Sequence, residues 1–244
     1  MLKKVLLGFV ALIVLVVGAT AVWMSIPFSY NQQQTSDALI SSATVTVSQG
    51  DFLVFSPAQN IPQSGIIFYP GGKTSAATFA PFMRRFAEQD YLAVIAPMPL
   101  KTAFLGINKA DDVMAAYPAV KQWVIAGHSL GGVGATEYIK GADLTKVKGL
   151  LLLASYPASD ISGLNVAVMS ISGAKDLQST PAKISANAPK LPATTEYVVI
   201  ENANHWQFGS YSADNTKQQG LLSPDVQAEQ VFSHSLGFLQ GLGF

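Results

Sequence analysis

The stretch that decides the fold reads Trp123-Val124-Ile125-Ala126-Gly127-His128-Ser129-Leu130-Gly131-Gly132 and lies in the middle of a chain of 244 residues. The apolar run 122–126 predicts a β-strand, and residues 130–140 have helical character. Between them, the pattern Gly-x-Ser-x-Gly is typical of a sharp turn from strand to helix, where flanking side chains would clash with backbone. This turn predicts an α/β fold with an exposed nucleophilic serine, Ser129.

Short apolar runs alternate with helical stretches on both sides of this turn. The runs are residues 65–69, 91–96, 122–126, 147–154, 166–172 and 196–200. Helices are expected over residues 76–89, 109–116, 130–140, 181–187 and 223–239. Such alternation predicts a mostly parallel sheet flanked by helices. Residues 44–47 and 52–55, joined by a glycine turn, predict a hairpin, and the short connection after residue 154 predicts that there is no cap domain.

A serine nucleophile needs a base, and the chain has three histidines. His128 lies within the turn itself and His234 within the predicted last helix, so His205, on a loop after the run 196–200, is the expected base. Asp176 follows the run 166–172 and is the expected supporting acid, which would fix the tautomer of the histidine. Asp160, in the preceding loop, is the alternative acid.

The oxyanion of an acyl-transfer reaction needs two backbone N–H donors. Leu130, directly after the serine and at the start of a helix, is expected to supply one of them. The loop Tyr69-Pro70-Gly71-Gly72-Lys73 follows an earlier strand, and either Gly72 or Lys73 is expected to supply the other.

Composition excludes several other classes of protein. Charged residues make up 12% of the chain and give a formal net charge of zero, so no nucleic-acid partner is expected. There is no cysteine, which removes thiol nucleophiles, thiolate metal sites and disulfides. Since the sequence shows no clustered metal ligands and no phosphate-loop motif, no metal and no cofactor are expected.

The N-terminus carries an uncharged and mostly apolar run from Val5 to Met24 after Lys3 and Lys4. About 20 such residues can cross a bilayer as a helix, and the lysines favour a cytoplasmic N-terminus. We therefore expect a transmembrane segment over residues 1–24, a solvated linker over 25–42 and an extracytoplasmic catalytic domain over 43–244. The alternative is a signal peptide cleaved near Ala21, with secretion of the domain.

Four segments of the chain resemble the α/β-hydrolase fold-5 family, small hydrolases distantly similar to the dienelactone hydrolases. They are Tyr69-Pro70-Gly71-Gly72-Lys73, Ala96-Pro97-Met98-Pro99, Gly127-His128-Ser129-Leu130-Gly131-Gly132 and Asn204-His205-Trp206-Gln207-Phe208-Gly209. The resemblance implies a Ser-Asp-His hydrolase and supports Ser129, Asp176 and His205. One departure is Asn202-Ala203, where glycines are expected.

The expected activity is cleavage of small carboxylic esters with short acyl groups at an open site, through an acyl-enzyme. A thioesterase, lactonase or amidase would use the same three residues. A cell-surface binding protein that keeps the fold without turnover is the competing class.

Overall fold

The computed structural model describes residues 2–214 and 222–243 and contains one eight-stranded sheet. The strand order is β1-β2-β4-β3-β5-β6-β7-β8. The strands are β1 (Val45–Gln49), β2 (Leu53–Pro57), β3 (Ser64–Tyr69), β4 (Leu92–Ile95), β5 (Gln122–His128), β6 (Val147–Leu153), β7 (Ala167–Gly173) and β8 (Glu196–Ile200). β2 is antiparallel to both of its neighbours, and all other pairs are parallel. The predicted hairpin and all six apolar runs thus form strands.

Helices connect the strands and cover both faces of the sheet. The α-helices are α1 (Leu2–Ser25), α2 (Gln32–Ala38), α3 (Ala80–Ala87), α4 (Lys109–Ala116), α5 (Leu130–Ile139), α6 (Pro181–Asn187) and α7 (Pro224–Gly241). Short 3-10 turns are η1 (Ala76–Phe79), η2 (Pro99–Lys101), η3 (Ala103–Leu105), η4 (Ala188–Lys190) and η5 (Trp206–Phe208). The predicted helix over 76–89 is therefore split into η1 and α3, and the other four predicted helices are present.

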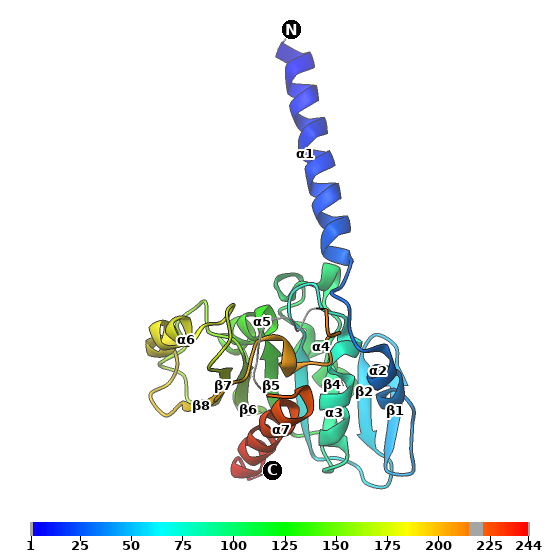
Figure 1. Cartoon of the computed structure of the whole chain (residues 1–244), viewed down its shortest axis with the longest axis vertical. Coiled ribbons are helices and arrows are strands. Elements are labelled where there is room, and N and C mark those ends of the chain that lie inside the picture. The colour runs from blue at the N-terminus through cyan, green and yellow to red at the C-terminus, as the bar shows by residue number, and fades with distance from the viewer. Residues whose placement is uncertain (1, 215–221, 244) are drawn as a thin grey trace.

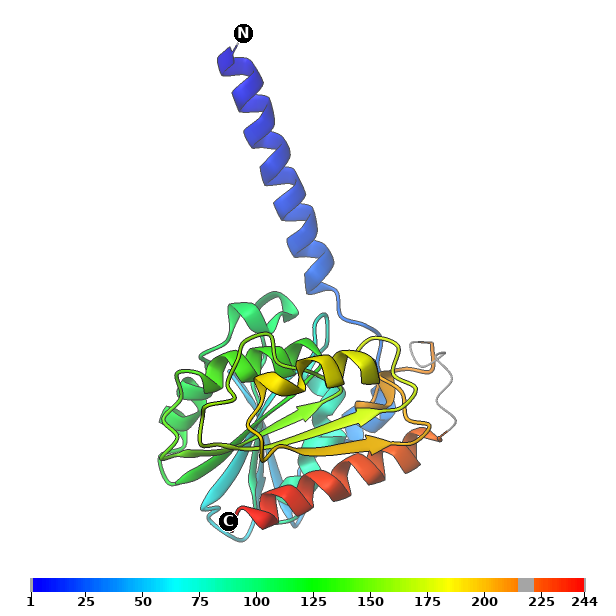
Figure 2. The same ribbon diagram turned by 90° about the vertical axis from the view of Figure 1, so that its left-hand side faces the viewer.

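The core consists of two layers of buried side chains, one on each face of the sheet. Alternate residues of β3 separate into them, because Phe68 packs with α2, α3 and α7, whereas Ile67 packs with α4 and α5. Figure 2 shows α7 on one face of the sheet and α6 on the other. The domain is thus a three-layer α/β/α structure, as predicted from the alternation of runs.

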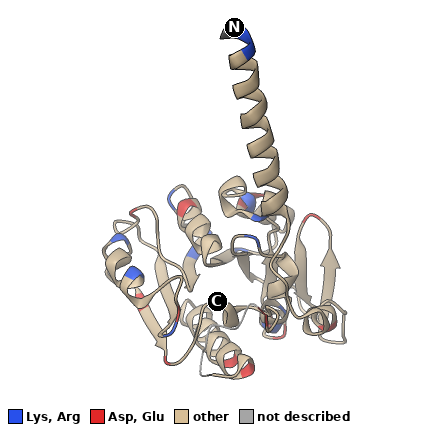
Figure 3. Cartoon of the chain, turned by 45° about the horizontal axis from the view of Figure 1, so that its top comes forward, with Lys and Arg blue, Asp and Glu red and all other residues tan. Residues whose placement is uncertain are grey.

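α1 extends away from this domain (Figure 1). Its segment Lys3–Ser25 is long and apolar enough to cross a membrane, and none of its most apolar window is buried against the domain. Figure 3 shows no charged residue along α1 beyond its first turn, where Lys3 and Lys4 lie.

The segment between α1 and the sheet differs from the expected solvated linker, because it contains the helix α2. Asn31 caps this helix, its side chain accepting the N–H of Gln34 at 3.1 Å. The guanidinium of Arg84, on α3, donates to the carbonyls of Ala38 and Ile40 at 3.0 and 2.6 Å. The polar composition of the segment gave no sign of a helix. Arg84, more than 40 positions later in the chain, holds the end of this helix in place.

The connection between β6 and β7 contains no helix or strand among residues 154–166, all of which the structure describes. No cap domain is inserted at this position, as predicted. The carboxyl ends of the parallel strands, where the predicted site residues lie, are therefore not covered from this side.

Candidate active site

The turn that carries Ser129 has the geometry expected for a nucleophile. β5 ends at His128 and α5 begins at Leu130, so Ser129 is the single residue between strand and helix. Its backbone angles are φ 53° and ψ −123°, a strained region for a residue with a side chain. The Ser129 N–H donates to the Leu153 carbonyl at 3.0 Å, and Ser155 Oγ donates to the Ser129 carbonyl at 2.7 Å. The end of β6 and the loop that follows it thus hold the strained turn in place.

Two glycines of the turn allow backbone to approach backbone closely. A Cβ on Gly131 would lie 1.9 Å from the carbonyl oxygen of Tyr69, at the end of β3. A Cβ on Gly127 would lie 2.4 Å from the carbonyl carbon of Gly131. The Gly-x-Ser-x-Gly spacing thus follows from the packing of α5 against β5 and the end of β3.

Asp176 and His205 meet at the carboxyl ends of β7 and β8. His205 Nδ1 lies 2.7 Å from Asp176 Oδ2, and both side chains are almost fully buried. The other carboxylate oxygen, Oδ1, accepts the backbone N–H groups of Gln178 and Ser179 at 2.7 and 2.8 Å. These bonds fix the carboxylate, and the carboxylate in turn selects the tautomer of His205 with the proton on Nδ1. Nε2 is left to act toward a substrate or a nucleophile.

Asp160, the alternative acid, is not brought to His205. Its carboxylate is exposed and accepts the N–H and the hydroxyl of Ser162 at 2.9 and 2.7 Å. These bonds from Ser162 lower the pKa of Asp160. Asp160 stabilises a local turn, and Asp176 is the acid that the fold pairs with His205.

The loop that carries His205 accommodates the departure from the expected glycines. Asn202 has φ 61°, a left-handed conformation that asparagine tolerates better than most residues with a side chain. The loop is then tied to α7, since Asn204 N–H donates to Gln227 Oε1 at 3.0 Å and Gln227 Nε2 donates to the Asn204 carbonyl at 2.8 Å. The loop that carries His205 is therefore held in a fixed position although Asn202 and Ala203 stand where glycines are expected.

Ser129 and His205 line one small cavity of about 30 Å³. The other lining residues are Phe28, Gly71, Gly72, Thr74, His128, Gln178, Trp206 and Tyr211. Phe28 comes from the segment just after α1, and its ring contacts Trp206 edge to face at a centroid distance of 5.1 Å. Sequence reasoning did not find Phe28, because nothing local indicates that this segment folds back over the strand ends.

The three predicted oxyanion donors differ in whether their N–H groups already have an acceptor. The Lys73 N–H donates to the Lys101 carbonyl at 2.9 Å, so it is already used and the expectation for Lys73 is corrected. A Cβ on Gly72 would lie 3.1 Å from Leu130 Cδ2, which places Gly72 beside the start of α5. Within the described residues, no acceptor is found for the N–H of Gly72 or of Leu130. These two groups remain as donors.

His128 supports the histidine loop from behind. Its Nε2 lies 3.1 Å from the carbonyl of His205, to which it donates, and the two rings are 4.7 Å apart at their centroids. Burial and the neighbouring His205 hold the pKa of His128 well below its usual value of 6.5. His128 is thus a neutral side chain that positions the His205 backbone, a role that its place in the sequence did not indicate.

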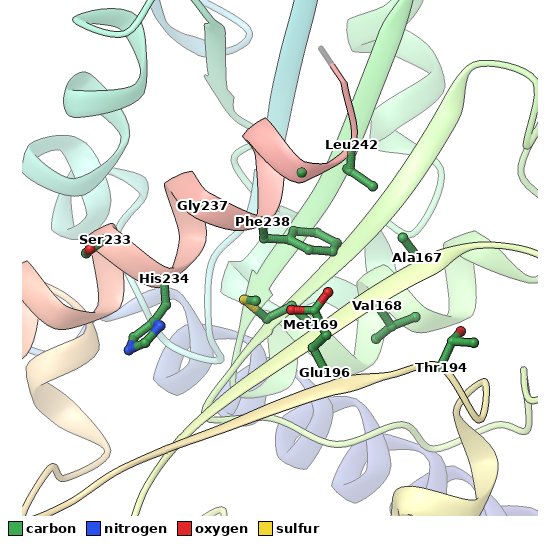
Figure 4. A pocket seen from close by; sticks show the side chains of 11 residues that line it. Ala167, Val168, Met169, Thr194, Glu196, Ser233, His234, Gly237, Phe238 and Leu242 are labelled. Atoms are coloured by element: carbon green, nitrogen blue, oxygen red, sulfur yellow. The ribbon is translucent and has the colours of Figure 1, made fainter.

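A second, larger cavity of about 610 Å³ lies at the opposite edge of the sheet, at the amino ends of β7 and β8 (Figure 4). It contains Ser233 and His234, but these successive residues of α7 project in different directions. Because this cavity lies at the amino ends of the strands, His234 lies far from Ser129, as its position in the last helix predicted.

A strained serine between β5 and α5, with a paired aspartate and histidine after β7 and β8, is the arrangement typical of α/β hydrolases. A family model described as the alpha/beta hydrolase family matches residues 65–229. The chain belongs to this family, and the resemblance seen in the sequence is confirmed.

Solved structures share this fold at low sequence identity. Carboxylesterase CesB from Bacillus subtilis is 13% identical with a TM-score of 0.60, over 86% of this chain and 95% of that one. A thermophilic esterase from Thermogutta terrifontis is 18% identical with a TM-score of 0.52, over 80% and 92% of the two chains. A putative dienelactone hydrolase from Klebsiella pneumoniae is 16% identical with a TM-score of 0.51, over 78% and 97%. No curated protein matches the chain.

Proposed function

We propose that this protein is a serine hydrolase that cleaves carboxylic esters with small acyl groups. In this proposal Ser129 is the nucleophile, His205 the base and Asp176 the supporting acid. The observation that carries it is the 2.7 Å contact between buried Asp176 and His205. His205 in turn lines the same small cavity as the strained Ser129. Strain and buried pairing of this kind are retained where the chemistry uses them.

The proposed cycle has two steps. Ser129 Oγ attacks the ester carbonyl carbon as its proton passes to His205 Nε2, and the oxyanion accepts the N–H groups of Leu130 and Gly72. The bond to the alcohol oxygen then breaks, and His205 gives that oxygen the proton. Water, deprotonated by His205, attacks the acyl-enzyme, and the acid leaves as Ser129 regains its proton.

The size of the cavity favours a short acyl group. Its volume is only about 30 Å³, and the rings of Phe28, Trp206 and Tyr211 border it. A long acyl chain would have to extend out of this cavity or displace these rings. The β6–β7 connection inserts no cap over the site, so the size of the alcohol group of the ester is less restricted than that of the acyl group.

We also propose that α1 is an uncleaved membrane anchor, with the hydrolase domain outside the cytoplasm. The length of α1 and its lack of charge after Lys4 support this placement. The two lysines ahead of the apolar run favour retention of the N-terminus in the cytoplasm.

The test is hydrolysis of p-nitrophenyl acetate, butyrate and octanoate by the full chain in mild detergent. We expect kcat/KM to be highest for the short esters and to fall steeply for octanoate, with turnover lost in Ser129→Ala. A thioester and a lactone of matched acyl size, assayed in parallel, rank the alternative substrates. A folded wild-type protein that turns over none of them would contradict the proposal and favour a binding protein.

A further inference from the structure

The end of α1 lies directly beside the candidate active site. Lys73 Nζ lies 3.6 Å from the centre of the Trp23 ring, in the last turns of α1. The Phe28 N–H then donates to the Lys73 carbonyl at 2.8 Å, and the Phe28 ring lines the cavity. Only two residues, Ile26 and Pro27, therefore separate the end of α1 at Ser25 from Phe28 in the wall of the site. Trp and Lys side chains are enriched where a helix leaves the bilayer.

The same side of the domain exposes a group of large apolar side chains. We call this group the apolar rim; its members are Ile26, Leu100, Phe104, Leu105 and Leu177. Ile26 lies two positions before Phe28, and Leu177 precedes Gln178, both residues of the cavity wall. Leu100 lies in η2, and Phe104 and Leu105 lie in η3, which contacts η2. η2, which contains Leu100, contacts α1, and α1 projects away from the domain on this side (Figure 2).

Exposure of the rim is costly in water. Leu105 and Leu177 are 57% and 68% exposed, and removal of such apolar surface from water is favourable. Leu100 also has φ 47°, a strained conformation for a bulky residue. Exposed apolar groups gathered on one face mark a surface that meets a partner or a membrane. Because the rim is continuous with α1, which we propose as a membrane anchor, the bilayer is the partner that best fits this surface.

Basic side chains accompany the rim. Lys101 and Lys175 lie on the same loops as Leu100 and Leu177, and the Lys73 ammonium is held over Trp23 at the end of α1. If the rim entered the boundary between lipid headgroups and acyl chains, these lysines would lie at the level of the lipid phosphates.

We propose that the carboxyl edge of the sheet lies on the bilayer surface in which α1 is anchored, so that the site takes its ester from the membrane. The substrate class is a membrane-resident amphiphile with a short acyl group. The acyl group enters the small cavity, and the apolar alcohol portion stays in the lipid beside the rim. This inference rests on the proposed function and on α1 as an anchor, and it adds where the substrate comes from.

The first test needs no activity and uses the absence of cysteine from the chain. A nitroxide is attached to the full-length variants Leu105→Cys, Leu177→Cys and Ile61→Cys in phosphatidylcholine–phosphatidylglycerol vesicles. Ile61 is the control because it is 77% exposed and precedes β3, at the amino edge of the sheet. We expect the labels at 105 and 177 to collide more with oxygen than with a water-soluble nickel chelate, and the label at 61 to do the opposite. Equal exposure to water at all three positions would overturn the proposal.

The second test separates the membrane surface from the chemistry. The substrates are the acetyl ester of a long-chain alcohol in vesicles and p-nitrophenyl acetate in water. We expect the double variant Phe104→Asp, Leu105→Asp to lose about tenfold on the vesicle ester and to keep the activity on the soluble ester, while Ile61→Asp keeps both.

Equal losses on the two esters would contradict the proposal, because they would show damage to the site itself. The wild-type protein could hydrolyse neither ester while the labels at 105 and 177 still collide more with oxygen than with the nickel chelate. That result would contradict the proposed hydrolase function and support the membrane-facing surface. The two failures are therefore distinguishable.

Discussion

At the scale of single residues, Asp176 is the side chain whose role the structure defines most narrowly. Its two oxygens are divided between His205 and two backbone N–H groups, so Asp176→Asn would offer His205 an amide in place of a carboxylate. We expect kcat to fall about a thousandfold or more, with KM little changed, because the wrong tautomer is favoured. Steady-state kinetics with p-nitrophenyl acetate measure this change.

Asp160→Asn is the matched control for this prediction, since Asp160 is the nearest alternative in the sequence and is bonded to Ser162. It should leave kcat within about twofold, as surface substitutions usually do. A loss in Asp160→Asn without a loss in Asp176→Asn would reverse the assignment of the acid.

His128 gives the second prediction at this scale, through the pH dependence of stability. Its pKa is held well below 6.5 in the folded state, so the unfolded chain binds the proton more readily. Stability is then complete above about pH 6.5 and falls as the pH drops below that value, by up to about 1.4 kcal/mol per pH unit.

His128→Gln keeps an N–H donor for the His205 carbonyl but cannot titrate. We expect the free energy of unfolding, measured by urea denaturation in detergent at pH 7.5 and 5.5, to depend less on pH in this variant. An unchanged dependence would show that His128 is not the group responsible.

At the scale of elements, the packing of α5 on the end of β3 determines whether the turn of Ser129 can form. Gly131→Ala places a Cβ where the Tyr69 carbonyl oxygen lies, so helix and loop must separate. We expect a loss of about 1–3 kcal/mol or more in the free energy of unfolding and loss of esterase activity. Gly141→Ala, at a position with open space, is the control and should change neither.

The elements that the sequence predicted are those with a local signal. β3 and β6 are apolar runs buried on both faces, and α7 begins with a capping serine whose Oγ accepts the Val226 N–H. α2 was missed because its composition is polar and its position depends on Arg84. The Lys73 N–H was misjudged for the same reason, since its acceptor, Lys101, comes from another loop. Ser129, Asp176 and His205 could be proposed because their types and order are constrained by the fold.

At the scale of the whole molecule, α1 determines where the chemistry takes place. If α1 is a retained anchor, the full chain produced in a bacterial host should stay in the membrane fraction after alkaline carbonate extraction and keep its original N-terminus. Protease added outside the inner membrane should then degrade the domain and spare α1. A soluble product that begins near Val22 would show instead that the segment is a cleaved signal peptide.

The central claim is that Ser129 is an activated nucleophile, and covalent labelling tests it most directly. The full chain is treated with a fluorophosphonate probe and the modified peptide is mapped by mass spectrometry, with His205→Ala and His234→Ala as paired variants. The account predicts one label, on Ser129, that is lost in His205→Ala and retained in His234→Ala. A folded wild-type protein that takes up no label, or a label at another serine, would contradict it.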